Sequence, residues 1–248
     1  MIDLSHVGFA YKENIPVLQD VDLHIEAGES VGLIGANGAG KSTLMKLLVG
    51  LLRASEGEVK VCGKKVDKKS LPEIRRRIGY VFQDADNQLF MSTVYEDIAF
   101  GPLNYGLSKE EADAKVQAAM EQTGTTHLKD QPIYQMSGGE KRLVSIATIL
   151  AMEPDCILMD EPEAALDPRN RRRLIELLNT LRPAKLIASH DLDMILDTCD
   201  RTILMSHGRI VADGPTQQIL RDKKLLEEND LELPLRLQSY DEKEVNHE

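Results

Sequence analysis

The stretch SVGLIGANGAGKSTLMKLL, residues 30–48, decides the fold. Its centre, GANGAGKST at residues 35–43, fits the pattern G-x-x-x-x-G-K-[ST]. An apolar run ends at Ile34, and apolar residues recur at helical spacing from Lys41 to Arg53. Because a strand, a glycine-rich loop and a helix in this order are the context that the pattern requires, we expect an α/β domain built around a phosphate-binding loop.

The chemistry of this loop follows from its residue types. Glycines let backbone N–H groups turn inward onto phosphate oxygens, and the helix N-terminus adds a favourable dipole. Lys41 is placed to reach the β- and γ-phosphates of a nucleotide, and Ser42 offers a hydroxyl to Mg²⁺. The alternative, a glycine-rich turn with an accidental lysine, does not account for the strand and helix on either side.

A second motif, CILMDEP at residues 156–162, predicts a buried strand that ends in two carboxylates. Asp160 at the strand end can hold Mg²⁺ through water, and Glu161 can polarise an attacking water. Alone, an apolar strand followed by an acidic pair is better interpreted as a strand-end turn. Beside a phosphate loop, it indicates hydrolysis of a nucleoside triphosphate.

A third motif, SGGEKR at residues 137–142, precedes another helical pattern. Ser137 is a natural N-cap, and the two glycines that follow give a flexible entry to the helix. Two glycines before a helix also make a second anion site. Two phosphate-binding helix termini in one chain favour ATP held between two copies.

Composition limits the classes of protein to consider. The chain has 248 residues, of which 42% are hydrophobic and 29% charged, so a soluble α/β domain with a sizeable core is expected. The net charge of −11 argues against bulk attraction to nucleic acid or an anionic bilayer. Cys62, Cys156 and Cys199 are scattered, and neither the cysteines nor the six histidines show metal-ligand spacing. With no spanning segment and no signal peptide in the sequence, we expect a protein of the cytosol, or one held on a membrane by a partner.

The hydrophobic pattern predicts the domain organisation. Apolar strands that alternate with helices indicate a sheet covered on both faces. A helical block interrupts this pattern, and within it Ser108 and Glu111 have capping-box spacing while Gly124 is a natural stop. We predict one domain over residues 1–220, a helical subdomain inserted at about 88–153, and a short acidic tail over 221–248.

These motifs, in this order, resemble those of the ABC transporter ATPases. The order includes Gln83 after the phosphate loop, then SGGEKR, LMDEP, AALD at 164–167 and ASHD at 188–191. The resemblance runs from about Ile2 to Leu220. It implies a P-loop, RecA-like core, a small antiparallel β subdomain, and an inserted helical subdomain that carries the SGGEKR signature. It also implies a head-to-tail dimer with two ATP molecules and Mg²⁺ at the interface.

The resemblance assigns roles residue by residue. Glu161 is the general base, Gln83 and Asp160 serve Mg²⁺ and the attacking water, and His190 contacts the γ-phosphate. For Tyr11 it implies stacking on adenine, although an ordinary strand-edge tyrosine is the alternative. Asp167 belongs to a loop that crosses the dimer, or it simply caps the following helix. The residues expected to bind the phosphates are Gly35, Asn37, Gly38, Gly40, Lys41, Ser42 and Thr43, with Ser137, Gly138 and Gly139 contacting the opposite ATP.

Three positions depart from the family pattern. Ala36 replaces a frequent proline, and Glu140 stands where glutamine is common, adding a negative charge near a nucleotide. Glu163 follows Pro162 where a small hydroxyl residue is usual. A second carboxylate beside Glu161 is expected to hinder its ionisation or to alter closure of the dimer.

The loop FQDADNQLF, residues 82–90, resembles the ATPases of energy-coupling-factor transporters through Gln83, Asp86, Asn87 and Gln88. These transporters take up vitamins or cobalt and nickel ions. The implied partners are a transmembrane coupling subunit, a substrate-binding membrane subunit, and a second copy of this ATPase or a homologous one. The stretches LELPL (231–235) and SHDLDMILDTCDR (189–201) favour the cobalt and nickel branch, with a vitamin transporter as the alternative.

Three other functions compete with this interpretation. ABC ATPases that act on ribosomes or DNA usually carry two ATPase units or a long coiled coil, and this chain shows neither. The signature and His190 argue against a small-molecule kinase. An exporter ATPase is opposed only by the segment Asp86–Gln88. The arginine runs 75–77 and 171–173 are more simply solvated faces or subunit contacts than a nucleic-acid patch.

Overall fold

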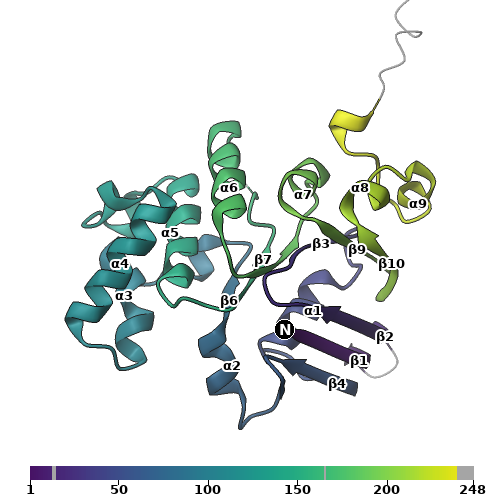
Figure 1. Cartoon of the computed structure of the whole chain (residues 1–248), viewed down its shortest axis with the longest axis horizontal. Coiled ribbons are helices and arrows are strands. Elements are labelled where there is room, and N and C mark those ends of the chain that lie inside the picture. The colour runs from purple at the N-terminus through teal and green to yellow at the C-terminus, as the bar shows by residue number, and fades with distance from the viewer. Residues whose placement is uncertain (13–14, 165, 239–248) are drawn as a thin grey trace, which may run out of the picture.

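The computed structural model describes residues 1–12, 15–164 and 166–238. These residues form a six-stranded sheet in the order β10-β9-β3-β8-β7-β6 and a four-stranded antiparallel sheet in the order β2-β1-β4-β5. Figure 1 shows the large sheet between the antiparallel strands on one side and the helices α3, α4 and α5 on the other. The predicted α/β fold class, with its antiparallel layer and helical subdomain, is confirmed.

The bounds of the elements are as follows. The strands are β1 Ile2–Lys12, β2 Ile15–Ile25, β3 Ser30–Ile34, β4 Glu56–Val61, β5 Lys64–Lys65, β6 Ile78–Val81, β7 Cys156–Asp160, β8 Ala184–Ala188, β9 Arg201–Ser206 and β10 Arg209–Pro215. The α-helices are α1 Lys41–Leu48, α2 Leu71–Arg77, α3 Val94–Asn104, α4 Lys109–Thr123, α5 Gly138–Leu150, α6 Pro168–Thr180, α7 Leu192–Thr198, α8 Thr216–Ile219 and α9 Lys223–Glu227. Among the described residues, no helix combines the length and apolar character needed to cross a bilayer.

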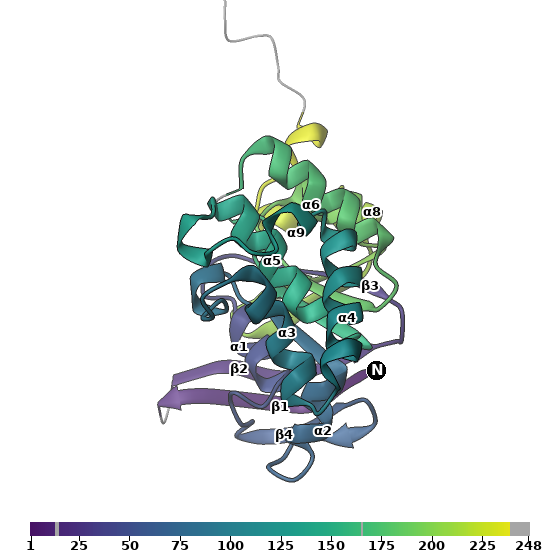
Figure 2. The same ribbon diagram turned by 90° about the vertical axis from the view of Figure 1, so that its left-hand side faces the viewer.

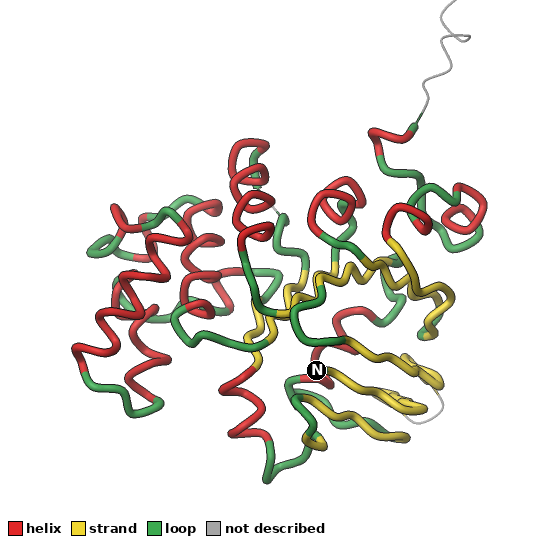
Figure 3. Tube along the Cα trace, in the orientation of Figure 1, coloured by secondary structure: helices red, strands yellow, loops and turns green. Residues whose placement is uncertain are grey.

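The parallel strands are buried along their whole length, as their continuous apolar sequences predict. Successive side chains of a strand face opposite sides of the sheet, so β7 serves two cores. Cys156 and Leu158 pack in the core that contains α1, whereas Ile157 and Met159 pack in the core that contains α5, α6 and α7. Figure 3 shows α6 and α7 above this sheet and α1 below it.

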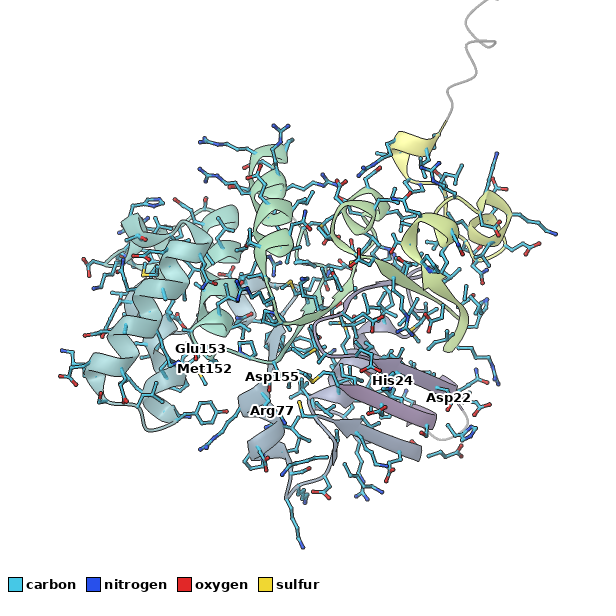
Figure 4. The ribbon with its side chains drawn as sticks, viewed as in Figure 1. Asp22, His24, Arg77, Met152, Glu153 and Asp155 are labelled. Carbon is cyan, nitrogen blue, oxygen red and sulfur yellow. The ribbon has the colours of Figure 1, made fainter. Side chains whose placement is uncertain are left out.

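The antiparallel sheet is buried on one face only. In β2, Val21, Leu23 and Ile25 are buried, while Asp22 and His24 between them are exposed. Figure 4 shows Asp22 and His24 on this outer sheet. The buried side chains pack in the same core as α1, so the phosphate-loop helix lies between the two sheets.

The helices α3, α4 and α5 pack against one another and form the helical subdomain (Figure 2). They occupy residues 94–150, within the predicted limits of 88–153, and the limits themselves stay a prediction. The predicted stop at Gly124 is confirmed, because this residue has a left-handed φ of 67° and ends α4. Each helix begins with a capping box, formed by Thr93 with Glu96, Ser108 with Glu111, and Ser137 with Glu140.

The helix α1 differs from the sequence expectations, and several short elements were not predicted. The helix expected over 41–53 ends at Leu48, because Gly50 turns left-handed and the N–H of Leu51 bonds the carbonyl of Lys46 at 2.9 Å. The short helix α2 was not predicted, since Ile74 is its one buried side chain. The strand β10 was also not predicted; it pairs with the edge strand β9 in antiparallel orientation.

The first part of the predicted acidic tail packs against the domain. Leu226 is buried, and Leu231 and Leu233 pack against the core beside it. Arg236 bonds Asp193 at 2.7 Å and Asp197 at 2.8 Å, which attaches this segment to α7. The remainder of the tail, residues 239–248, lies outside the described residues.

The chain returns from the helical subdomain to the sheet through residues 151–155. Arg77 at the end of α2 pairs with Asp155 at 2.6 Å, and its carbonyl accepts the N–H of Asp155 at 2.8 Å. Figure 4 shows these two residues close together, beside Met152 and Glu153. The contact fixes the start of β7 against that of β6, and both strands end at the candidate site.

Gly79 of β6 tests how closely α5 packs on this sheet. A Cβ at this residue would lie 2.1 Å from Cγ2 of Ile149. We expect Gly79→Ala to lower the free energy of unfolding by about 1–3 kcal/mol, measured by urea denaturation, because overpacking forces α5 outward. Gly214→Ala in β10 is the control, since its Cβ would meet nothing closer than 3.9 Å. Equal stability of the two variants would contradict the close packing.

Candidate nucleotide-binding site

Four parallel strands end at one edge of the large sheet. β3, β8, β7 and β6 are neighbours in parallel register, so the loops that follow them emerge together. The loop after β3 is the predicted phosphate loop, β7 ends at Asp160, and β8 is followed by His190. Gln83 lies just beyond β6. The topology therefore gathers residues that are far apart in the sequence.

The phosphate loop wraps around the side chain of Lys41. Its Nζ donates to the carbonyls of Gly35 at 2.7 Å and Ala36 at 3.2 Å, and it lies 3.4 Å from Nε2 of His190. Gly35 has a φ of 150°, and a Cβ there would lie 2.3 Å from the carbonyl oxygen of Met205. Only glycine fits this close approach, so the curvature of the loop depends on it.

A pocket of about 360 Å³ opens beside this loop. Tyr11 stands at its rim, 59% exposed, with its hydroxyl 3.3 Å from Oγ1 of Thr43. An exposed aromatic ring at the rim has a free face for a base. A larger cavity of about 600 Å³, between α7 and residues 231–238, includes His190 but none of the phosphate loop. The smaller pocket is lined by Tyr11, Val17, Asn37, Gly38, Ala39, Gly40, Lys41, Ser42, Thr43, Glu161 and His190.

The side-chain oxygen atoms beside the phosphate loop are suitable ligands for Mg²⁺. The hydroxyl of Ser42 donates to Oδ1 of Asp160 at 3.1 Å, and the Tyr80 hydroxyl donates to Oδ2 at 3.1 Å. Burial, with Asp160 nearby, raises the pKa of Tyr80 well above its ordinary value, so it remains a donor. Hydroxyl and carboxylate oxygens are the hard ligands that Mg²⁺ prefers. Ser42 and Asp160 would hold the ion, whereas the Gln83 side chain bonds Glu161.

Glu161 lies between two polar side chains. Nε2 of Gln83 donates to its Oε2 at 2.6 Å, and Nε2 of His190 lies 3.2 Å from its Oε1. The backbone of Glu161 is left-handed, with a φ of 47°, and its N–H bonds the carbonyl of Ala188 at 2.8 Å. A sparsely populated backbone conformation at a strand end is common where a side chain must be aimed. The predicted residues Gln83, Glu161 and His190 thus form one cluster.

The electrostatics of this cluster favour an uncharged histidine. Burial lowers the pKa of His190 below 6.5, and the neighbouring Lys41 lowers it further, against the raising effect of Glu161 and Asp160. Burial also lowers the pKa of Lys41, and the same two carboxylates oppose that effect. At neutral pH His190 is therefore uncharged.

The signature residues begin α5 and do not line this pocket. Ser137 caps the helix, its N–H and hydroxyl both donate to Oε2 of Glu140, and its Oγ accepts the Glu140 N–H at 3.3 Å. These bonds hold the pKa of Glu140 below its ordinary value. The carboxylate of Glu140 is therefore hydrogen-bonded within its own chain, in the capping box with Ser137. Ser137, Gly138 and Gly139 are not brought to the phosphate loop of their own chain.

Asp167 caps α6, which is the simpler of the two roles considered for this residue. Its carboxylate accepts the N–H groups of Arg169 at 2.8 Å and Asn170 at 2.9 Å. Its predicted place in a loop that crosses a dimer stays a prediction. Ala165, in the same AALD motif, lies outside the described residues.

Sequence reasoning missed how the loop after β6 is fastened to α5. Gln88 donates to the carbonyl of Ser145 at 2.6 Å and to Oγ1 of Thr148 at 2.9 Å, and it accepts the N–H of Phe82. Asp86 pairs with Lys141 of the same helix at 2.6 Å. Gln88 thus connects this loop to α5 and is not a solvated surface group. Gln88 and Ser145 are 57 residues apart, and sequence patterns relate only residues a few positions apart, so no pattern could have predicted this contact.

Arg142 completes this attachment from α5. Its guanidinium donates to the carbonyl of Phe82 at 2.5 Å and to the carbonyl of Gln83. It belongs to the SGGEKR motif, but the motif alone does not say what the arginine contacts. The loop that carries Gln83 and the helix that begins with the signature are therefore one connected unit.

Within the part of the chain that the structure describes, one cluster with metal-ligand geometry lies away from this site, where the spacing of histidines and cysteines in the sequence predicted none. His6, Asp20 and Asp22 place one ligand atom each within 4.8 Å of the others on the antiparallel sheet. All three are exposed, and His6 bonds Asp20 at 2.8 Å. The cluster shares no residue with the nucleotide pocket.

A glycine-rich turn into a helix, with its lysine beside a strand-end carboxylate, is the arrangement of P-loop nucleoside triphosphatases, and this geometry places the protein in that class. The profile of the family described as ABC transporter matches residues 18–164. The chain therefore belongs to the ABC transporter family, as an ATP-binding and ATP-hydrolysing cassette.

Individual relatives are similar over nearly the whole chain. A putative ABC transporter ATP-binding protein of Geobacter sulfurreducens is 48% identical, over 95% of this chain and 94% of its own. The energy-coupling factor transporter ATP-binding protein EcfA of Methanocaldococcus jannaschii is 40% identical, over 94% and 86%. The structure of cbiO1 from Clostridium perfringens, part of the ABC transporter complex cbiONQ, matches with a TM-score of 0.83 and 35% identity, over 92% of this chain and 93% of its own.

The electrostatics of His190 give a prediction for its titration. Because its pKa is lowered, the folded state binds fewer protons than the unfolded state just below pH 6.5. The stabilising contribution is therefore present above pH 6.5 and is lost as the pH falls through the folded-state pKa. We expect the ring NMR signals of His190, assigned with His190→Gln, to titrate below 6.5. In Lys41→Ala the midpoint should rise, and a wild-type midpoint at or above the ordinary value would contradict the geometry.

Proposed function

We propose that this chain is the ATP-hydrolysing subunit of an energy-coupling-factor importer that powers micronutrient uptake, with cobalt or nickel ions as the cargo. The observation that carries the proposal is the loop FQDADNQLF, whose polar side chains are fastened to α5 while Phe90 is 65% exposed. The name of EcfA supports the energy-coupling-factor class, and cbiO1 is likewise part of an ABC transporter complex. An ATPase of a vitamin-uptake energy-coupling-factor transporter is the alternative to the cobalt and nickel cargo.

ATP lies with its base against Tyr11 and its phosphates in the loop Gly35–Thr43. Backbone N–H groups of the loop and the N-terminus of α1 bind the phosphate oxygens, and Lys41 neutralises the β- and γ-phosphates. Mg²⁺, when bound with the nucleotide, supplies further charge neutralisation, and Ser42 and Asp160 hold it there. These contacts orient the γ-phosphate toward Glu161 and His190, which face the same pocket.

Glu161 takes a proton from the attacking water as the general base. Gln83 holds one oxygen of this carboxylate at 2.6 Å, and His190 lies beside the other at 3.2 Å, so the base is aimed by two neighbours. Neutral His190 is a hydrogen-bonding partner for the γ-phosphate rather than a second cation. The arrangement stabilises the transition state mainly by positioning and by fixed charges.

The second phosphate-binding terminus requires a partner ATPase. Ser137, Gly138 and Gly139 begin α5 and lie outside the pocket of their own chain. In a head-to-tail dimer they bind the γ-phosphate of the opposite nucleotide. The partner is a second copy of this chain or a homologous ATPase, and the two ATP molecules lie at their interface.

The membrane partners dock beside the loop after β6. Phe90 and Phe100 are exposed apolar residues in contact, with ring centroids 4.9 Å apart and nearly perpendicular planes. Exposed aromatic groups beside a loop that senses nucleotide suit a transmembrane coupling subunit, which in turn contacts a substrate-binding membrane subunit. The chain then works as a peripheral subunit on the cytoplasmic face of the membrane. Its net charge of −11 agrees with partners that are proteins and not nucleic acid.

Removal of the general base tests the hydrolytic mechanism. We expect Glu161→Gln to lower kcat by at least about 100-fold, because an amide cannot accept the proton, while ATP binding persists. The variant should form dimers that depend on ATP, measured by size-exclusion chromatography with light scattering. Normal turnover in this variant would exclude Glu161 as the base.

Co-purification from membranes tests the transport assignment. We expect the tagged chain, taken from detergent-solubilised membranes, to bring integral membrane subunits with it, identified by mass spectrometry. Phe90→Asp should reduce their recovery at least about tenfold, because a charge is placed in the apolar contact. Val211→Asp on β10, also exposed in the wild type, is the control and should leave recovery unchanged. Finding no integral membrane partner would exclude the importer.

A further inference from the structure

Arg171 differs from the other two arginines of the run 171–173. Arg172 and Arg173 are exposed, as expected of a solvated face, whereas only 32% of the Arg171 side chain is accessible. All three lie on α6, which packs beside α7 on the same face of the large sheet (Figure 1). The interpretation of the run as a solvated face therefore does not extend to Arg171.

The partner of Arg171 is Asp191, the N-cap residue of α7. Nη2 of the guanidinium donates to Oδ1 of the carboxylate at 2.8 Å, and Nε donates to Oδ2. Two parallel, charge-assisted hydrogen bonds fix the orientation of both groups. Burial raises the pKa of Asp191, but the hydrogen bonds from Arg171 and from the Met194 N–H hold it below its ordinary value.

Asp191 belongs to a hydrogen-bonded turn that includes His190. Its Oδ1 accepts the N–H of Met194 at 2.8 Å, and its own N–H donates to Oγ of Ser189 at 2.8 Å. The N–H of Ser189 donates to the carbonyl of Leu33 at 3.3 Å. The backbone is therefore held on both sides of His190, by β3 on one side and by α7 on the other.

The position of the His190 imidazole depends on this backbone. Its side chain is 37% exposed, so packing alone does not fix the ring. Nε2 lies 3.2 Å from Oε1 of Glu161 and 3.4 Å from Nζ of Lys41. A displacement of the backbone would change both distances, and a misplacement of about 1 Å at a reacting centre can cost about 100-fold in rate.

We propose that Arg171 is a positioning residue for ATP hydrolysis, which fixes the backbone of His190 through Asp191 and so aims the imidazole at the γ-phosphate. Of the residues that the structure describes, those lining the nucleotide pocket include His190 but not Arg171, so the arginine acts from outside the pocket. A lysine would keep the charge but not the two parallel hydrogen bonds. The inference rests on the contact with the γ-phosphate proposed above for His190.

The first test is steady-state ATPase activity of the full chain over a range of ATP concentrations. We expect Arg171→Gln to lower kcat at least about tenfold with KM for ATP within about twofold, because the ring is misplaced while the rest of the pocket is intact. Arg171→Lys should fall between this variant and the wild type. Asp191→Asn keeps a cap on α7 but loses the charge that pairs with the arginine, so it should also lower kcat. A wild-type kcat in Arg171→Gln or in Asp191→Asn would overturn the proposal.

Arg236→Gln is the matched control for a general loosening of α7. Arg236 bonds Asp193 at 2.7 Å and Asp197 at 2.8 Å, so this change removes an arginine from the same helix but leaves the turn at His190 intact. Its kcat should stay within about twofold of the wild type. A loss as large as that in Arg171→Gln would mean that any loosening of α7 lowers activity, and the specific role of Arg171 would be excluded.

A second readout reports on the imidazole itself. The ring NMR signals of His190, assigned with His190→Gln, should shift in Arg171→Gln and remain at their wild-type positions in Arg236→Gln. A merely structural arginine would not change this ring selectively. Unchanged His190 signals in Arg171→Gln would show that the arginine does not position the ring.

One further variant separates this proposal from the mechanism on which it rests. If His190→Ala keeps the wild-type kcat, the proposed role of the histidine fails, and the role of Arg171 fails with it. If His190→Ala lowers kcat while Arg171→Gln does not, the proposed hydrolytic mechanism stands and only the positioning role is overturned.

Discussion

Burial of a parallel sheet on both faces is the constraint from which the rest of this structure follows. β3, β6, β7 and β8 have no solvated side, so helices must cover both faces, and every crossover returns the chain to the same edge. Residues from four distant parts of the sequence therefore meet where those strands end. The nucleotide pocket results from this topology, and residues of the phosphate loop form most of its lining.

The loop after β6 is attached to α5, so the site is connected to the helical subdomain. Gln88, Asp86 and the backbone of Gln83 are all bonded to side chains or carbonyls of α5. The loop that carries Gln83 and the helix that begins with the signature are therefore held together by hydrogen bonds and an ion pair. The same loop bonds Glu161 through Gln83 and leads to Phe90, which contacts Phe100 on the surface.

Local signals in the sequence predicted most of the elements and the residues of the pocket. The phosphate loop, the strand ending at Asp160 and the capping box at Ser108 each depend on neighbours within a few positions, so pattern alone identifies them. What pattern could not show are contacts across the fold, such as Gln88 with Ser145, Tyr80 with Asp160, and Arg142 with the carbonyl of Phe82. The short helix α2 escaped prediction because one buried residue gives no periodicity.

The capping box at the start of α5 has a consequence for the dimer proposed above, in which Ser137 binds the opposite nucleotide. Before any nucleotide arrives from another subunit, Glu140 already supplies a negative charge to the hydroxyl and backbone of Ser137. An incoming phosphate therefore competes with a resident anion. The hydroxyl of Ser137 cannot donate to that phosphate while it donates to Glu140, and the carboxylate also repels the phosphate. In the proposed dimer, the hydrogen bonds between Ser137 and Glu140 therefore have to be exchanged before Ser137 binds the opposite nucleotide.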